Sequence, residues 1–298
     1  MVERQVYPMK QLRFLMNFAA IGALLSLGFT SCRESRPKIS KDESVPLLVS
    51  PTDAPSGSET PGVHWVKVAV PRNGVLLAAV AQPEGAGPFP AVVILHGSHG
   101  FAQEYVELAR AMTRTGVVAV AACWFTGGRG AGSRFITPIQ WSQAPPMSEA
   151  SSPVAQQTVD TLVRAVRTLP GVRADRVALF GHSRGGGAIL NYILRTGSVQ
   201  AAVLNSAGYP EELGKRAPEV NTPILIMHGT ADNPDGGGSA FTNVQMARNF
   251  EAALRRAGKR VEATYYEGAG HNDIFTNATQ CDDQLQRTSA FLRQYFSD

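Results

Sequence analysis

The most constraining feature of this sequence is a serine between two glycines, in the pentapeptide Gly-His-Ser-Arg-Gly at 181–185. An apolar run at 176–180 precedes it directly, and a stretch compatible with a helix follows. A serine on a tight strand-to-helix turn has its hydroxyl pushed out of the sheet edge, and the glycines prevent Cβ collisions with the neighbouring strand and helix. The helix start also directs the backbone N–H of Arg184 to where an oxyanion would develop. This order predicts a nucleophile, Ser183, at the edge of an α/β sheet.

Apolar runs and helix-compatible stretches alternate from about Val63 onward. We expect strands at His64–Val70, Val75–Ala81, Ala91–Leu95, Val117–Ala122, Arg176–Phe180, Ala201–Leu204, Pro223–Met227 and Val261–Tyr266. We expect helices at Gln103–Thr113, Pro153–Leu169, Arg184–Arg195, Gln245–Ala257 and Asp282–Phe296. Runs such as 91–95 and 224–227 are apolar throughout, which is typical of strands covered on both faces of a parallel sheet. The pattern predicts an α/β fold with one mostly parallel, doubly wound sheet flanked by helices, and a hairpin of the first two strands at its edge.

Residues 1–31 have the pattern of an export signal. Lys10 and Arg13 precede an apolar stretch at 14–29 that is too short for a comfortable membrane span, and small residues follow it. Cys32 stands where a bacterial lipoprotein carries its lipidated cysteine, and an ordinary secretory peptide is the alternative. We therefore expect an exported protein, periplasmic or at the cell surface, held to a bacterial membrane by a lipid anchor.

Behind the signal, residues 32–62 are rich in Ser, Pro, Lys and Glu and are predicted to be a flexible tether. Residues 63–298 are expected to form the catalytic domain. An exported compartment permits a disulfide between Cys123 and Cys281, and two separate thiols are the alternative.

Ser183 needs a base and an orienting acid, and two loops downstream supply candidates. Asp232 follows an apolar strand within His-Gly-Thr-Ala-Asp, and His271 lies in a glycine-rich loop after the last strand. Because the carboxyl ends of parallel strands share one edge of the sheet, these residues are expected to converge with Ser183. The base is predicted to accept the serine proton while Asp232 fixes its tautomer, with Asp235 and Asp273 as alternative acids.

The loop His-Gly-Ser-His-Gly at 96–100 leaves an inner strand. Such a loop can direct a backbone N–H to the same point as the N–H of Arg184. We predict that Ser98 and Arg184 form the oxyanion hole.

The other histidines at strand ends have a simpler interpretation, since His96, His182 and His228 are expected to hydrogen-bond loop backbone. His99 is the one alternative base because its loop faces the site. No cluster of His, Cys, Asp and Glu has the spacing of metal ligands, and no dinucleotide-binding glycine pattern follows the first strand. We expect no metal and no cofactor.

Residues 124–152 interrupt the alternation with a long loop, which is uncommon in a compact domain unless it has a function. Its aromatic residues either line an acyl or alcohol pocket or cap the sheet, and its arginines either receive a carboxylate or face solvent. The candidates for substrate contact are Trp124, Phe125, Arg129, Arg134 and Trp141.

Together these motifs resemble the α/β-hydrolase superfamily and, within it, the dienelactone hydrolase-like serine hydrolases. The resemblance covers about residues 63–298 and rests on the motifs at 96–100, 181–186, 228–232 and 268–271. It implies an α/β-hydrolase fold and hydrolysis by an activated nucleophile. Dienelactone hydrolases proper use a cysteine where this chain has Ser183, so dienelactone itself is a poor candidate substrate.

The sequence therefore predicts a carboxylesterase-like serine hydrolase that cleaves small-molecule esters through a Ser-His-Asp acyl-enzyme mechanism. The alternatives are a thioesterase, a prolyl-oligopeptidase-like peptidase and a non-catalytic surface lipoprotein that uses the fold as a binding module.

Outside residues 1–31 the chain has 25 basic and 23 acidic residues, since that segment holds three of the 28 basic and one of the 24 acidic residues. This balance, with no basic cluster among aromatics, argues against nucleic-acid binding.

Overall fold

The computed structural model describes residues 49–128 and 135–297. The predicted signal segment at 1–31, the lipidation site Cys32 and the candidate substrate residues Arg129 and Arg134 lie outside these residues. No helix in the described ranges has the length and apolar character needed to cross a membrane.

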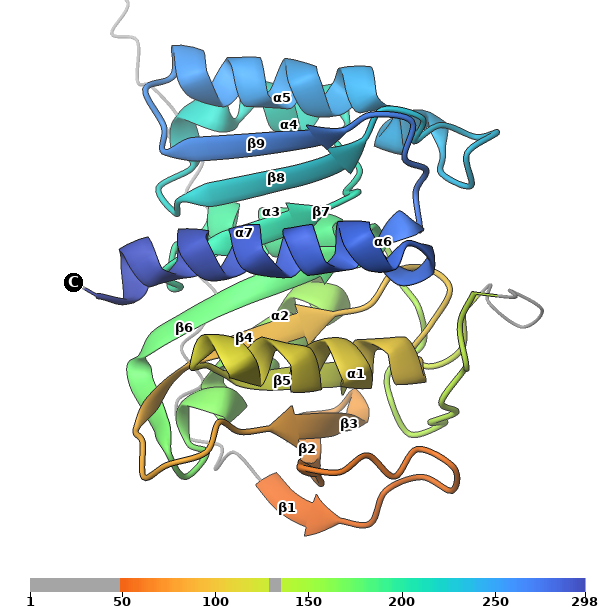
Figure 1. The fold of residues 1–298 in the computed structure, drawn as a ribbon, viewed down its shortest axis with the longest axis vertical. Helices are drawn as coiled ribbons and strands as arrows, with labels where there is room; N and C mark the ends of the chain where they lie inside the picture. The colour runs from red at the N-terminus through yellow and green to blue at the C-terminus, as the bar shows by residue number, and fades with distance from the viewer. Residues whose placement is uncertain (1–48, 129–134, 298) are drawn as a thin grey trace, which may run out of the picture. The chain divides into compact units, whose positions relative to one another are not determined.

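Nine strands form one sheet, in the order β1-β2-β3-β5-β4-β6-β7-β8-β9 (Figure 1). They are β1 (Val49–Thr52), β2 (Val63–Val70), β3 (Gly74–Ala81), β4 (Phe89–Leu95), β5 (Val118–Cys123), β6 (Val172–His182), β7 (Ala202–Asn205), β8 (Ile224–Gly229) and β9 (Val261–Tyr266). Strands β1, β2, β3 and β5 pair antiparallel in that order, and every pair from β5 to β9 is parallel. The mostly parallel sheet expected from the sequence is confirmed.

Helices cover both faces of this sheet. They are α1 (Gln103–Met112), α2 (Pro153–Arg167), α3 (Arg184–Thr196), α4 (Glu211–Lys215), α5 (Val244–Arg256), α6 (Asp273–Thr276) and α7 (Ala278–Phe296), with 3-10 turns η1 (Thr113–Thr115), η2 (Ala217–Glu219) and η3 (Ala240–Thr242). Helices α1 and α7 lie in front of the sheet in Figure 1, while α2 and α3 lie behind it. A sheet with helices on both faces is the doubly wound arrangement that the alternation of strands and helices predicted.

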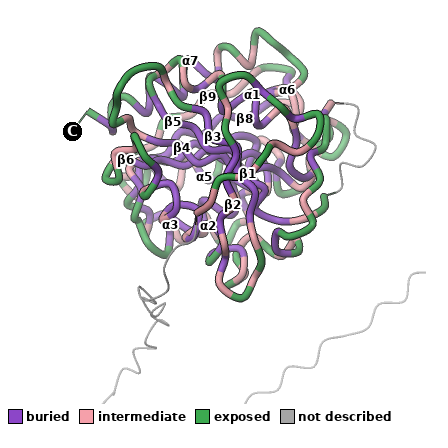
Figure 2. Tube along the Cα trace, turned by 90° about the horizontal axis from the view of Figure 1, so that it is seen from below, coloured by how far each residue is buried: buried purple, intermediate pink, exposed green. Residues whose placement is uncertain are grey.

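The sheet interior accounts for the apolar runs of the sequence. Strand β5 and residues 91–95 of β4 are buried along their whole length, and Figure 2 shows the buried strands at the centre of the molecule. On α7 the side chains of Leu285, Ser289 and Phe296 are buried, so one face of this helix packs against the core.

The predicted tether is wrong over its last part. Residues 32–62 were expected to be flexible, but Val49–Thr52 forms β1 and pairs with β2 from Val49 opposite Val68 to Thr52 opposite Trp65. The β2–β3 hairpin is therefore present but is not the edge of the sheet. Strand β1 is short and contains Pro51, which only an edge strand tolerates easily, so its sequence resembles that of a linker.

The start of one helix differs from the sequence prediction, and the structure decides between the two alternatives for the cysteines. Helix α7 begins at Ala278, four residues before the expected Asp282, because Asn277 caps it by accepting a hydrogen bond from the N–H of Gln280. Cys123 is buried at the end of β5 and Cys281 is half-buried on α7, and both are free thiols. The disulfide alternative is therefore wrong.

Candidate active site

The turn that carries Ser183 has the geometry that its glycines predicted. Ser183 connects β6 to α3 with φ 53° and ψ −117°, a strained conformation for a residue with a side chain. A Cβ on Gly181 would lie 2.5 Å from the backbone of Gly185, and a Cβ on Gly185 would lie 2.2 Å from the carbonyl oxygen of Leu95. Only glycine allows the helix to begin this close to both strands.

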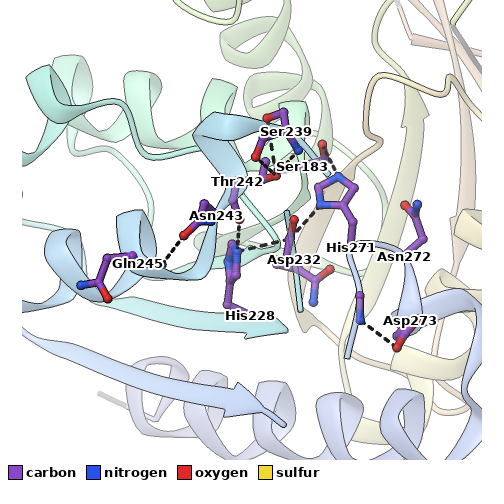
Figure 3. Close-up of polar contacts among 12 residues, drawn as sticks. Ser183, His228, Asp232, Ser239, Thr242, Asn243, Gln245, His271, Asn272 and Asp273 are labelled. Atoms are coloured by element: carbon purple, nitrogen blue, oxygen red, sulfur yellow. Dashed lines mark hydrogen bonds and ion pairs between the residues drawn. The ribbon is translucent and has the colours of Figure 1, made fainter. Parts of the chain in front are cut away.

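Three side chains from distant parts of the chain meet at this turn (Figure 3). The Oγ of Ser183 lies 2.9 Å from Nε2 of His271, and Nδ1 of His271 lies 2.8 Å from Oδ2 of Asp232. Asp232 follows the end of β8 and His271 follows the end of β9, so all three lie at the carboxyl edge of the parallel sheet. This arrangement can pass a proton from a serine hydroxyl to an imidazole that a carboxylate orients.

The alternative acids lie elsewhere. Asp235 is exposed. The carboxylate of Asp273 accepts hydrogen bonds from the N–H of Gly270 and the hydroxyl of Thr276. Asp273 thus holds the backbone of the His271 loop, and only Asp232 among the predicted acids contacts the imidazole of His271.

Asp232 is fully buried, yet its carboxylate is kept ionised. Burial alone raises its pKa, but hydrogen bonds from His228 and His271 outweigh that effect and lower the pKa to about 2. The Nε2 of His228 lies 3.2 Å from the same Oδ2 that His271 contacts. A negative charge is therefore fixed beside the imidazole that would become positive during catalysis.

The long glycine-rich loop after Asp232 wraps around this pair. The carbonyl oxygen of Gly236 accepts the N–H of His271 at 3.0 Å. A Cβ on Gly238 would lie 2.0 Å from Oδ1 of Asp232, so only glycine leaves room for the carboxylate. This loop is therefore part of how the site is built.

The predicted oxyanion residues also lie at the nucleophile. A Cβ on Gly97 would lie 3.1 Å from Cβ of Ser183, which places the 96–100 loop directly against the serine. The Nε of Arg184 donates to Oγ of Ser98 at 3.1 Å, and its Nη1 donates to the carbonyl oxygen of Ser148 at 2.7 Å. The Arg184 side chain thus ties the 96–100 loop and the 124–152 loop to the start of α3.

His182, next to the nucleophile, binds side chains rather than backbone. Its Nδ1 lies 2.7 Å from Oδ1 of Asn205, whose amide N–H donates to Oε1 of Gln284. The Nδ1 of His182 therefore carries the proton, and its Nε2 faces the side-chain amide of Asn272 at 3.2 Å. Burial lowers the pKa of His182 to about 3, so this ring stays neutral at physiological pH.

The alternative base, His99, is engaged elsewhere. The hydroxyl of Tyr105 accepts the N–H of Gly97 and lies 2.8 Å from Nε2 of His99, so it donates to that nitrogen. Burial and the neighbouring histidines lower the pKa of His99 to about 2. His96 hydrogen-bonds the carbonyl oxygen of Gly97, as predicted, and burial lowers its pKa to about 3.

The aromatic candidates of the 124–152 loop cap the sheet. Trp124 and Phe125 are each only 2% exposed, and Nε1 of Trp124 donates to the carbonyl oxygen of His96. Nε1 of Trp141 donates to the carbonyl oxygen of Val75, on the antiparallel part of the sheet. The burial of Trp124 and Phe125 and the backbone hydrogen bonds of the two indoles favour a structural role over a place in a substrate pocket.

Two phenylalanines that the sequence analysis missed lie closer to the site. The half-buried rings of Phe135 and Phe275 stack at 6.4 Å, and Phe275 lies 5.2 Å from the ring of His182 and 6.0 Å from that of His99. Phe275 stands four residues after His271, on the short helix α6. No local pattern pointed to it, because the rings that Phe275 contacts come from other segments of the chain.

Within the described part of the chain, no group of three or more His, Cys, Asp or Glu side chains is placed to hold a metal ion. The chemistry available at this edge is that of the hydroxyl, the imidazole and the carboxylate.

Comparison with known proteins identifies the family and the fold. The sequence model of the dienelactone hydrolase family matches residues 76–296. A “Putative carboxymethylenebutenolidase” of Methylorubrum extorquens is 23% identical over 236 residues, which cover 76% of this chain and 78% of that protein. The dienelactone hydrolase of Anabaena variabilis has a similar fold, with a TM-score of 0.59 and 20% identity over 80% of this chain and all of that one. The propionate-bound esterase Est2 of Thermogutta terrifontis gives a TM-score of 0.58 and 19% identity, over 78% of this chain and 94% of its own.

Proposed function

Since the chain belongs to the dienelactone hydrolase family and is a hydrolytic enzyme of the serine hydrolase type, we propose that it cleaves carboxylic esters of small molecules through an acyl-enzyme on Ser183. The observation that carries the proposal is the line of contacts from Oγ of Ser183 through His271 to Asp232, at 2.9 and 2.8 Å. Its members lie on loops that a rigid parallel sheet holds in place, as a positioned nucleophile and base require.

In the first half-reaction, Oγ of Ser183 attacks the ester carbonyl carbon while Nε2 of His271 takes the hydroxyl proton. The oxygen of the tetrahedral intermediate would be held by the backbone N–H groups of Ser98 and Arg184. His271 then gives its proton to the leaving alkoxide, which departs as the alcohol and leaves an ester on Ser183. Water, deprotonated by His271, attacks that ester and releases the acid, and the proton returns to Ser183.

Replacement of Ser183 by alanine tests the proposal. We expect S183A to lose about 10⁶-fold in kcat for p-nitrophenyl acetate and to lose fluorophosphonate labelling, with an unchanged circular dichroism spectrum. S198A is the matched control, since the exposed Ser198 follows the far end of the same helix, α3. Labelling of S183A at the wild-type rate would contradict Ser183 as the nucleophile. Turnover of thioesters alone or of peptides alone would mean that the substrate bond is a thioester or a peptide bond and not an ester.

For the cellular location we propose export and a lipid anchor on Cys32. The support is the basic start, the apolar stretch at 14–29 and the cysteine that follows. Expressed in a Gram-negative host, the full chain is expected in the membrane fraction, and C32A is expected to move to the soluble exported fraction. Equal partition of both proteins would contradict the anchor.

A further inference from the structure

Two histidines, not one, bind the acid of the candidate site, and both use the same oxygen. Oδ2 of Asp232 lies 2.8 Å from Nδ1 of His271 and 3.2 Å from Nε2 of His228, while Oδ1 has no hydrogen-bond partner within the described residues (Figure 3). The side chains of His228 and Asp232 are both fully buried. A carboxylate out of contact with water depends on such donors to remain charged.

The surroundings of His228 fix its tautomer. Its Nε2 faces two acceptors, the carbonyl oxygen of Thr242 at 2.5 Å and Oδ2 of Asp232. Its Nδ1 is buried and has no partner among the described residues. The proton of a neutral His228 therefore lies on Nε2, which donates to both oxygens.

The loop that follows Asp232 fixes the position of the Thr242 carbonyl. Ser239 and Thr242 form a capping box around η3, in which the N–H of Ser239 donates to Oγ1 of Thr242 at 2.7 Å. This box orients the carbonyl oxygen of Thr242 that His228 contacts. Thus β8 supplies the donor, the N–H of His228, and the loop after Asp232 supplies the Thr242 carbonyl that orients it.

We propose that His228 is a positioning residue of the hydrolase, which acts through Asp232 and does not touch the substrate. Its N–H holds the carboxylate in the orientation that fixes the tautomer of His271, and it takes up part of the charge on Oδ2. This inference rests on the proposed function, since it assigns a role within the same site.

Two further titratable groups near His228 and His271 stay neutral in the pH range of catalysis. Tyr209 packs against the His228 ring at 5.9 Å, and burial, followed by the charges of Tyr265 and Asp232, raises its pKa well above the usual value. His182 lies 5.1 Å from the His271 ring and is neutral because burial lowers its pKa to about 3. A change in the acid limb of the pH–rate profile on replacing His228 therefore reports on Asp232 and His271.

Two variants of His228 separate the effect of losing its hydrogen bond from the effect of changing its packing. H228M fills similar space without a donor, and H228Q keeps an N–H at comparable reach. We expect H228M to lower kcat for p-nitrophenyl acetate about 100-fold with little change in KM, and H228Q to recover most of that loss. Without the donor, the charge of Asp232 is less compensated and stabilises the His271 imidazolium more strongly. We therefore expect the acid limb of kcat/KM to move to higher pH, by about half a unit to one unit.

A control and a second variant keep the inference open to refutation. H96M removes another buried histidine that does not contact Asp232, and we expect it to leave the acid limb where it is. If H228M does not fold, S239A provides the test, because it removes the half of the capping box in which the Ser239 side chain accepts the N–H of Thr242. This loosens the Thr242 carbonyl and is expected to move the same limb upward by a smaller amount. An acid limb at the wild-type position in every folded variant at His228 and Ser239 would overturn the proposal.

Two different results distinguish a wrong role for His228 from a wrong function of the protein. If the wild-type protein shows no turnover and no labelling that depends on Ser183, the function itself is wrong. If the wild-type protein is active through Ser183 and the variants of His228 keep its pH profile, only the role of His228 is wrong.

Discussion

The carboxyl edge of the sheet contains two groups of buried or half-buried histidines with opposite surroundings. In the acid group, His228 and His271 share the carboxylate of Asp232. In the aromatic group, His96, His99 and His182 contact backbone, a phenol and side-chain amides, and their rings lie within 6.0 Å of other aromatic rings.

The difference shows how one residue type is given two roles at one edge. Burial with no carboxylate lowers the pKa of His96 and His182 to about 3 and that of His99 to about 2, so these rings resist a proton. The acid group instead holds a fixed negative charge beside His271. This charge lies beside the imidazole that contacts Ser183, where it can stabilise the imidazolium that forms during catalysis.

Among changes to these two groups, the largest effect is expected from removing the charge that distinguishes them. We expect D232N to lower kcat/KM for p-nitrophenyl acetate about 10⁴-fold, because an amide N–H facing His271 favours the tautomer that cannot accept the serine proton. Steady-state kinetics and a circular dichroism spectrum measure the loss and the fold. D273N is the control, since that carboxylate binds loop groups only, and an equal loss in D273N would mean that the acid has been misassigned.

The aromatic group is expected to make the fold sensitive to acid. A histidine whose folded pKa is lowered is stabilising above its unfolded value of about 6.5, and that stability is lost as the pH falls toward the folded value. At pH 5.5 the unfolded chain has taken up nearly one proton at each of His96, His99 and His182, while the folded chain has taken up none. The free energy of unfolding should therefore fall by about 4 kcal/mol between pH 7.5 and 5.5. Urea unfolding at both pH values tests this, and a loss below about 1 kcal/mol would show that these rings are not held neutral.

Displacing the acid without changing its charge should have an intermediate effect. In G238A the new Cβ would lie 2.0 Å from Oδ1 of Asp232 and 2.5 Å from Oγ1 of Thr242, so the carboxylate or the loop must move. We expect kcat to fall about 30-fold to 100-fold, since small displacements in a catalytic site are costly. G214A is the matched control, because a Cβ there meets nothing within 4 Å, and equal kinetics in both variants would remove the role given to the Gly238 contact.

The smallest effect expected is that of a single neutral histidine. H96M should reduce the loss of unfolding free energy between pH 7.5 and 5.5 by about 1.4 kcal/mol, because one proton-linked group is gone. Any change in packing should be similar at both pH values and cancels in the difference. An unchanged pH dependence would place the acid sensitivity of the fold on other groups.

Much of the fold could be predicted because its signals are local. The apolar runs of β4 and β8 and the glycines around Ser183 specify buried strands and a tight turn within a few residues. Strand β1 was missed because Pro51 and polar neighbours resemble a linker, and only its pairing with β2 makes it a strand. Trp124 and Phe125 were left open between pocket and core, since an aromatic residue in a loop carries no local sign of what will cover it.

The sequence by itself determined that Ser183, Asp232 and His271 come to one edge, because parallel strands end on the same side and each residue follows a strand closely. Only the tertiary structure decided which nitrogen meets which oxygen. The second donor to Asp232 is His228, and its orientation depends on the carbonyl oxygen of Thr242. Thr242 lies ten residues after Asp232, and the loop between them folds back to bring this carbonyl to His228. Likewise, His96, His99 and His182 are neutral because they are buried among rings that distant segments of the chain supply. Local sequence cannot show which hydrogen-bond partner or buried environment a residue will obtain from a distant segment.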